Sequence, residues 1–303
     1  MSTFQSVAQR TIKLRLARVF PRRTTATPDD AHAFIGSPPR CIQHVDTVDI
    51  SCTFTADKDL AMQIAEEWDA KCKSVSVGGP AFGDRGGDFV PGKYLKRGYV
   101  ITSRGCPNRC WFCDVPIREG REMRELPITD GWNLLDSNLL ACSRPHIDGV
   151  FAMLKRQTER VQFTGGLEAA RLEDWHVSKL WDLRPEQMYF AYDTPDDLDP
   201  LVEAGRKLRR ADFTRRHLRC YVLIGHPKDT LDGAQARLLE AWDAGFMPMA
   251  MLWLPKTGAA RDGEWKKLQR RWARPAITRK VARELVTAAW EADRTSATGK
   301  GGE

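Results

Sequence analysis

From residue 98 onward the chain alternates short β-type runs with helical stretches, and this alternation limits the possible folds more than any other feature. Strands that alternate with helices form parallel sheets, because the chain must cross over one face of the sheet to reach the same edge again. The expected class is therefore α/β. The predicted strands are, in chain order, Gly98–Ser103, Gly131–Leu135, Val161–Thr164, Met188–Tyr192, Leu218–Ile224 and Met247–Trp253.

The N-terminal third predicts a separate, small α/β unit. Val48–Phe54 and Ser74–Val77 are typical of strands, and residues 57–72 between them are typical of a helix. The glycine-rich residues 83–97 predict a connecting loop. We expect three domains: an α/β unit with a basic lead-in at residues 1–95, a core at 96–256 and a basic helical extension at 257–303.

The first residues are basic, because Arg and Lys occur in residues 1–28 and no acid precedes Asp29. This pattern fits either an organelle transit peptide or an ordinary basic lead-in helix or arm, and we favour the lead-in. No apolar run is long enough to span a membrane, and no apolar signal-peptide core follows the basic start. Eight cysteines without such a signal indicate a reducing compartment. We expect the cytoplasm, or the host cytoplasm if the protein is viral.

Three cysteines follow the first predicted strand with the spacing C-x3-C-x2-C, at Cys106, Cys110 and Cys113. Thiolates so close on one loop can face a single metal centre. A [4Fe–4S] cluster ordinarily takes four cysteines, so three would leave one iron open to a small molecule. The alternative is a structural zinc site, which Cys142 and His146 could complete, but zinc sites usually pair two C-x2-4-C or C/H units and only one triplet is present. We favour the iron–sulfur interpretation.

This cysteine loop, with the aromatic Phe112 before its last cysteine, resembles that of the radical SAM (S-adenosylmethionine) superfamily. The resemblance implies a partial (β/α)6 barrel, here preceded by a small Rossmann-like unit. It implies that Cys106, Cys110 and Cys113 bind one [4Fe–4S] cluster, whose open iron binds S-adenosylmethionine, and that the segment around Phe112 contacts the adenine. It further implies reductive cleavage to a 5′-deoxyadenosyl radical and an electron donor such as flavodoxin or ferredoxin.

Members of this family usually carry a Gly-Gly-Glu run after the second strand, which holds the methionine amino group. This chain departs from that pattern, since Asp136 and Asn138 follow the second predicted strand while Gly165-Gly166-x-Glu168 follows the third. Active groups of such barrels lie at the carboxyl ends of the strands. We therefore expect Asp136 and Asn138 at the amino group and Glu168 at the substrate or ribose, with the roles exchanged if one strand is misplaced. The two glycines could also form a plain tight turn.

Later strand ends supply further candidate residues. Asp193 after the fourth strand could contact the ribose or substrate, or could cap the next helix. Tyr192 beside it could return a hydrogen atom. His226 after the fifth strand could act as a general base, although an ordinary loop histidine is the commoner case. Cys220, inside the fifth strand, is expected to be a buried core thiol.

The charge balance bears on the substrate. The net charge is +7, which suits a polyanionic partner. Aromatic residues interleaved with cations near the C-terminus suit nucleic acid, but an amphipathic helix with buried tryptophans also explains the pattern, and we favour the helix. The cations are Lys266, Lys267, Arg270, Arg271, Arg274, Arg279, Lys280 and Arg283, and the aromatics are Trp265 and Trp272.

Our favoured substrate is a base in nucleic acid. The compact single-cluster build resembles phage-type isomerases that remodel thymine side chains in DNA by moving a glycine attachment from nitrogen to carbon. A small-molecule or peptide substrate is the alternative within the same chemistry. A non-catalytic, zinc-stabilised nucleic-acid-binding protein is the alternative outside it. Cobalamin is not expected, since no Asp-x-His-x-x-Gly motif is present.

Overall fold

A computed structural model describes residues 12–255 and 263–298, and the chain forms two compact units, Met1–Gly131 and Trp132–Glu303. Both units are α/β with parallel sheets, as the alternation predicted. No helix in the described ranges is long and apolar enough to cross a membrane. The predicted boundaries near residues 95 and 256 remain predictions. Residues 1–11 of the basic lead-in, with 256–262 and 299–303 at the C-terminal end, lie outside the description.

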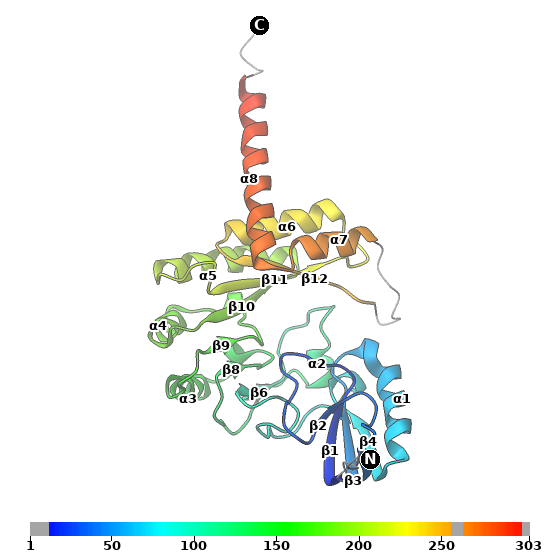
Figure 1. The fold of residues 1–303 in the computed structure, drawn as a ribbon. Coiled ribbons are helices and arrows are strands. Elements are labelled where there is room, and N and C mark those ends of the chain that lie inside the picture. The colour runs from blue at the N-terminus through cyan, green and yellow to red at the C-terminus, as the bar shows by residue number, and fades with distance from the viewer. Residues whose placement is uncertain (1–11, 256–262, 299–303) are drawn as a thin grey trace, which may run out of the picture. The chain divides into compact units, whose positions relative to one another are not determined.

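The first unit contains a parallel sheet in the order β2-β1-β3-β4, shown in blue and cyan in Figure 1. Helix α1 connects β3 to β4, which confirms the predicted strand–helix–strand unit. The elements of this unit are β1 (Ile12–Phe20), β2 (Ala33–Ile35), β3 (Ile42–Ser51), the 3-10 turn η1 (Thr55–Asp57), α1 (Lys58–Asp69), β4 (Cys72–Gly78), the 3-10 turn η2 (Pro80–Phe82), β5 (Tyr99–Val100), β6 (Ser103–Arg104), α2 (Val115–Arg118) and β7 (Arg124–Glu125).

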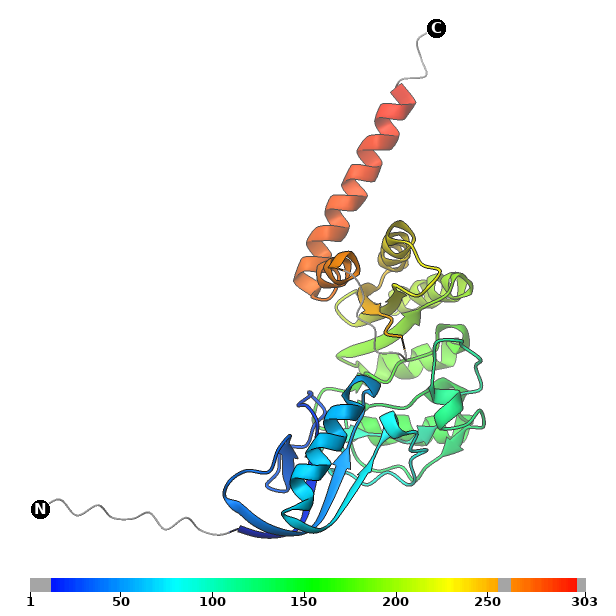
Figure 2. The ribbon, with the colours of Figure 1, turned by 90° about the vertical axis from the view of Figure 1, so that its right-hand side faces the viewer.

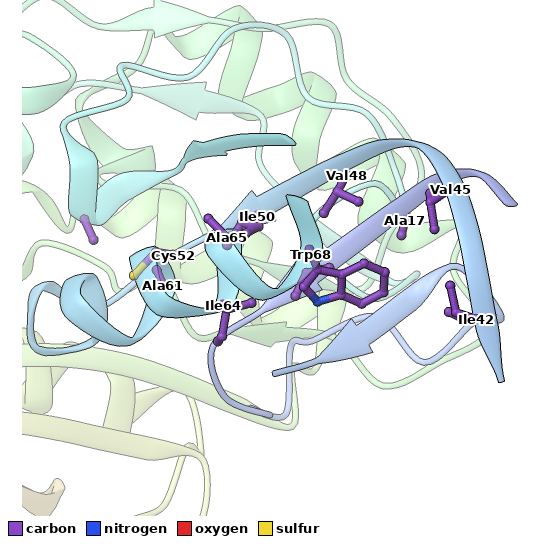
Figure 3. Packing of buried hydrophobic residues seen from close by; sticks show 12 residues of the cluster. Ala17, Ile42, Val45, Val48, Ile50, Cys52, Ala61, Ile64, Ala65 and Trp68 are labelled. Carbon is purple, nitrogen blue, oxygen red and sulfur yellow. The ribbon is translucent and has the colours of Figure 1, made fainter. Parts of the chain in front are cut away.

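The core of this sheet lies beneath α1, where Trp68 is the largest fully buried side chain (Figure 3). Its ring packs with buried aliphatic residues of the strands, among them Ile42, Val45 and Val48. Its indole Nε1 donates a hydrogen bond to the Gly36 carbonyl oxygen at 2.9 Å. The buried polar end of the ring is therefore paired, as burial in an apolar core requires.

The basic lead-in helix or arm is wrong for residues 12–20, because this segment is strand β1 between β2 and β3. Ala17 and Val19 are fully buried in the core, and Arg18 points to the opposite face of the sheet. The Arg18 guanidinium pairs with Asp30 and donates to the Gly92 and Lys93 carbonyl oxygens. These partners allow a buried cation inside a strand.

The second unit contains parallel strands in the order β12-β11-β10-β9-β8, so consecutive strands are neighbours (Figure 1). This order and these elements confirm five of the predicted strands. The elements are β8 (Asn133–Leu134), η3 (Leu139–Ala141), α3 (Arg144–Lys155), β9 (Gln162–Phe163), η4 (Ala169–Arg171), α4 (Asp174–Leu183), β10 (Gln187–Tyr192), η5 (Pro195–Asp197), α5 (Leu198–Arg210), β11 (Leu218–Ile224), α6 (Leu231–Asp243), β12 (Met247–Leu252), α7 (Gly263–Arg271) and α8 (Pro275–Thr298).

Alternate side chains of the long strands are buried against the helices. Phe190 of β10 packs edge-on against Phe246, with ring centroids 5.2 Å apart, and Cys220 of β11 is fully buried. Burial raises the pKa of the Cys220 thiol well above its usual value. This confirms that Cys220 is a core residue and excludes it from reactive thiol chemistry.

The predicted strand Gly98–Ser103 needs correction. The predicted first strand is divided into β5 and β6, and β6 pairs antiparallel with β7 because the chain turns back through the cysteine loop.

Near the C-terminus, α7 and the start of α8 are amphipathic, as the helix interpretation predicted. Figure 2 shows that α8 then extends away from the rest of the second unit. Trp272 is fully buried, whereas the basic residues around it are exposed. This tryptophan is therefore not available for stacking on bases.

The Trp68→Ala substitution should lower the free energy of unfolding of the first unit by about 3–5 kcal/mol, because it leaves a cavity in the core and an unpaired Gly36 carbonyl. Urea unfolding followed by circular dichroism measures this change. Leu60→Ala on the exposed side of α1 is the control and should change stability little. A Trp68→Ala protein as stable as the Leu60→Ala protein would contradict the described core.

Candidate functional site

The three candidate ligands lie on the loop between β6 and α2. Cys106 is buried, Cys113 is half-buried and Cys110 is exposed. The Cys113 amide donates to the Cys110 carbonyl oxygen at 3.1 Å, which turns the second half of the loop back on itself. Phe112 lies in this turn, and its ring packs edge-on against that of Trp111. The structure thus places the predicted ligands on one short, irregular segment.

The first turn of this loop is fixed by Gly105. It has a positive φ of 93°, and a Cβ atom there would lie 2.3 Å from the Glu122 carbonyl oxygen, so a larger residue is excluded. The Gly105 amide donates to Glu119 Oε2 at 2.9 Å, and the Cys106 amide donates to the Gly120 carbonyl oxygen at 3.2 Å. The segment after α2 therefore holds the backbone on which Cys106 stands.

Glu119 is only 3% exposed, so its charge needs partners. Arg118 Nη2 donates to its Oε1 at 2.7 Å, and Arg104 Nη1 lies 3.8 Å from the same oxygen. Arg85 donates to the Glu119 carbonyl oxygen at 3.3 Å, and Arg124 donates to the Arg85 carbonyl at 2.9 Å. Two arginines thus pair with one buried carboxylate, and two more bond to backbone carbonyl groups nearby, so positive charge exceeds negative charge beside the cysteine loop.

The thiols are not gathered around a point. Among the described residues, no group of three or more His, Cys, Asp or Glu side chains is arranged to hold a metal ion. Burial raises the pKa of the Cys113 thiol, and the negative charge of an ionised Cys106 raises it further. Cys142 and His146, the residues considered for a zinc site, lie at the start of α3 in the second unit, where Ser143 caps the helix through the His146 amide.

In the second unit, the ends of β8 and β9 meet closely. A Cβ atom on Gly165 would lie 2.4 Å from the Asp136 carbonyl oxygen, so only glycine fits there. The Gly165 amide donates to the Leu134 carbonyl oxygen at 2.9 Å, which continues the pairing of the two strands. Asp136 is 1% exposed at this corner. The glycine pair therefore allows a close strand approach, and Gly166 follows with a positive φ of 103°.

The two predicted alternatives for the amino group lie together. Asn138 Nδ2 donates to Glu168 Oε2 at 2.6 Å, and Arg171 Nε donates to the same oxygen at 2.7 Å. Asn138 is buried, while the Glu168 side chain is 22% exposed. An amide, a carboxylate and a guanidinium at one corner can bind an amino group and a carboxylate of one ligand.

Asp193 is bonded across the ends of β10 and β11, where its Oδ1 accepts from the Leu223 amide at 3.0 Å. Burial raises the pKa of this carboxyl to about 7; the Leu223 hydrogen bond opposes that rise and the charge of Asp197 adds to it. The helix cap is Thr194, whose capping box includes Asp197, so the predicted N-cap role of Asp193 is wrong. Asp193 is thus a buried acid that exchanges its proton near neutral pH.

Tyr192 lies on the other face of β10. Its hydroxyl donates to Glu240 Oε2 of α6 at 2.6 Å, and burial raises the pKa of the hydroxyl, which this hydrogen bond raises further. The side chain therefore points into the layer between sheet and helices. His226 is half-buried after β11, where its carbonyl oxygen accepts from the Asp229 amide at 2.9 Å. Asp229 also accepts from Gly225 and Arg237 and fixes this turn.

The residues that hold the cysteine loop could not be found from the sequence. Glu119 and Arg118 stand in an ordinary charged segment, and Arg85 stands in a glycine-rich loop. The only signal was the glycine before Cys106, which is typical of a strained turn.

Comparison of the chain with protein-family models gave no match, and comparison with curated proteins gave none either.

The Asp193→Asn substitution should remove a pH dependence of stability. The folded pKa of Asp193 lies near 7 and the unfolded value near 3.8, so the folded state holds the proton more tightly. Its contribution to stability is therefore largest below about pH 4 and is lost as the pH rises to about 7. Asn keeps an acceptor for the Leu223 amide. Urea midpoints across this range should fall more steeply in the wild type than in Asp193→Asn, and parallel curves would contradict this.

Proposed function

We propose that the chain is a radical SAM enzyme, with one [4Fe–4S] cluster bound by Cys106, Cys110 and Cys113. The observation that carries the proposal is the anchored loop with three cysteines at C-x3-C-x2-C spacing. Thiolate sulfur is the usual protein ligand of iron–sulfur clusters, so the donor set fits. When bound, the cluster supplies the electron that cleaves S-adenosylmethionine.

The surroundings of the loop support this assignment. The backbone at Cys106 is fixed by Gly105 and Glu119, whereas Cys110 and Cys113 lie on a turn without regular structure. The thiols must approach one another to share a centre, and such a turn allows this movement more readily than a helix or strand. The arginines around Glu119 offset the negative charge that thiolates bring together.

The second unit supports a partial barrel of the (β/α)6 kind. Strands β8 to β12 are parallel and occur in sequential order, as expected when each helix crossing moves the chain by one strand. The carboxyl ends of these strands supply Asp136, Asn138, Glu168 and Asp193. We assign Asp136 and Asn138 to the methionine amino group and Glu168 to the ribose or substrate. His226 remains the candidate general base and Asp193 a candidate contact to the ribose or substrate, whereas Tyr192 is left out because it points toward α6.

The favoured substrate is a base in nucleic acid, such as a hypermodified thymidine in phage DNA. The net charge of +7 supports this choice. Because Trp272 is buried, the pattern of aromatic and basic residues near the C-terminus supports this choice less than the sequence suggested. The reaction also needs an external one-electron donor, such as flavodoxin or ferredoxin. A small molecule or peptide is the second candidate substrate.

Replacement of any one of Cys106, Cys110 or Cys113 by Ala should abolish 5′-deoxyadenosine release from anaerobically reconstituted protein given dithionite and S-adenosylmethionine. The fold should persist, because none of these thiols belongs to the described apolar core beneath α1. Cys41→Ala, an exposed cysteine outside the loop, is the control and should keep full activity. A wild-type protein that binds zinc, carries no iron and releases no 5′-deoxyadenosine would overturn the proposed function.

The assignment of the amino-group site can be tested with two conservative variants. Asp136→Asn should raise the Kd for S-adenosylmethionine roughly 10- to 100-fold, since it removes a charged hydrogen-bond acceptor. Glu168→Gln should leave this Kd nearly unchanged while it lowers turnover. Equilibrium dialysis with labelled S-adenosylmethionine gives both constants, and iron content shows that the cluster remains. The reverse pattern would assign the amino group to Glu168.

A further inference from the structure

Two exposed phenylalanines lie at the carboxyl edge of the first unit's sheet. Phe54 follows β3 and is 46% exposed, and Phe82 ends the turn after β4 and is 37% exposed. Each ring has a cation over it: the Arg22 guanidinium lies 5.5 Å from the Phe54 centroid, and Lys58 Nζ lies 5.3 Å from the Phe82 centroid. We call these four residues the Phe54–Phe82 surface.

The four residues form one continuous surface. Arg22 follows β1 and pairs with the buried carboxylate of Asp57, which immediately precedes Lys58. Turns η1 and η2, which hold Asp57 and Phe82, contact each other. Three loops from three strands therefore bring two rings and two cations together. Neither ring belongs to the buried core cluster beneath α1.

The position in the sheet is one that favours ligand binding. In the order β2-β1-β3-β4 the chain leaves β1 in one direction for β2 and returns to its other side for β3. Ligands of open parallel sheets bind beyond the carboxyl ends of the strands at such a reversal. Arg22 and Phe54 follow the two strands that flank it.

The positive charge of Lys58 at this edge of the sheet does not stabilise the helix that carries it. Lys58 is the first residue of α1, where a cation opposes the helix dipole. Lys58 forms no ion pair with a carboxylate in the part of the chain that the structure describes. The buried Asp57 neutralises Arg22, and the exposed Asp59 lies nearby on α1, so the edge is weakly positive rather than strongly basic.

We infer that the Phe54–Phe82 surface binds single-stranded nucleic acid, with the rings stacking on bases and Lys58 at the phosphates. Exposed aromatic rings among cations are what sequence-tolerant single-strand binding requires. Weak positive charge favours stacking over purely electrostatic binding, which disfavours an intact duplex whose bases are inaccessible. The inference rests on the proposed function for its nucleic-acid substrate and names the single strand as the form that this unit holds.

The test is fluorescence anisotropy with a labelled 12-nucleotide single-stranded DNA and the full-length chain. The Phe54→Ala/Phe82→Ala double variant should bind at least about tenfold more weakly than wild type. Lys58→Gln should reduce the slope of log K against log salt by about 0.7. Trp181→Ala removes an exposed ring that is also paired with an arginine, Arg184, but lies on α4, so it is the matched control and should bind like wild type. Thermal unfolding verifies that each variant is folded.

The outcomes separate this inference from the proposed function. Binding by the Cys106→Ala protein equal to that of wild type, with loss in the phenylalanine variant, supports the surface whatever the chemistry. Equal binding by wild type and the phenylalanine variant, tighter binding of the matched duplex, or displacement by polyglutamate as efficient as by unlabelled DNA would each overturn the inference. Release of 5′-deoxyadenosine without nucleic acid tests the proposed function independently of these results.

Discussion

Parallel strand pairing is the constraint on which both units depend. In a parallel sheet the chain leaves every strand at the same edge, so residues far apart in sequence gather there. In the second unit this edge brings Asp136, Asn138 and Glu168 to one corner and places Asp193 across two strand ends. In the first unit it gathers Arg22, Phe54 and Phe82. The strand-end site proposed for the second unit and the nucleic-acid surface proposed for the first both follow from where the parallel sheets end.

The cysteine loop depends on a different device, which is a buried charge. Glu119 accepts the Gly105 amide and is itself held by arginines, so a carboxylate that would be costly to bury becomes a fixed anchor. The same arginines leave positive charge beside three thiols. A rigid backbone at Cys106 and a turn at Cys110 and Cys113 combine a fixed first ligand with two that can adjust.

Much of the fold could be predicted because the strands of the second unit are runs of aliphatic and aromatic residues, as at Leu218–Ile224. Strand β1 could not be predicted, because its basic residues suggested an exposed lead-in. The partners that allow Arg18 to be buried, Asp30 and the carbonyl groups of residues 92 and 93, are not evident from the sequence. The three cysteines could be proposed as a ligand set from their spacing alone. The contact of Asn138 with Glu168 depends on strand register, which a single sequence does not specify, so their roles had to remain alternatives.

Three cysteines on one cluster would leave one iron open for S-adenosylmethionine. Electron paramagnetic resonance of the reduced, reconstituted protein tests this proposal most directly, with and without S-adenosylmethionine carrying ¹⁵N in its amino group. The cluster signal should shift on addition and show hyperfine coupling to the ¹⁵N nucleus. A cluster signal that is unchanged by saturating S-adenosylmethionine, with no coupling, would contradict it.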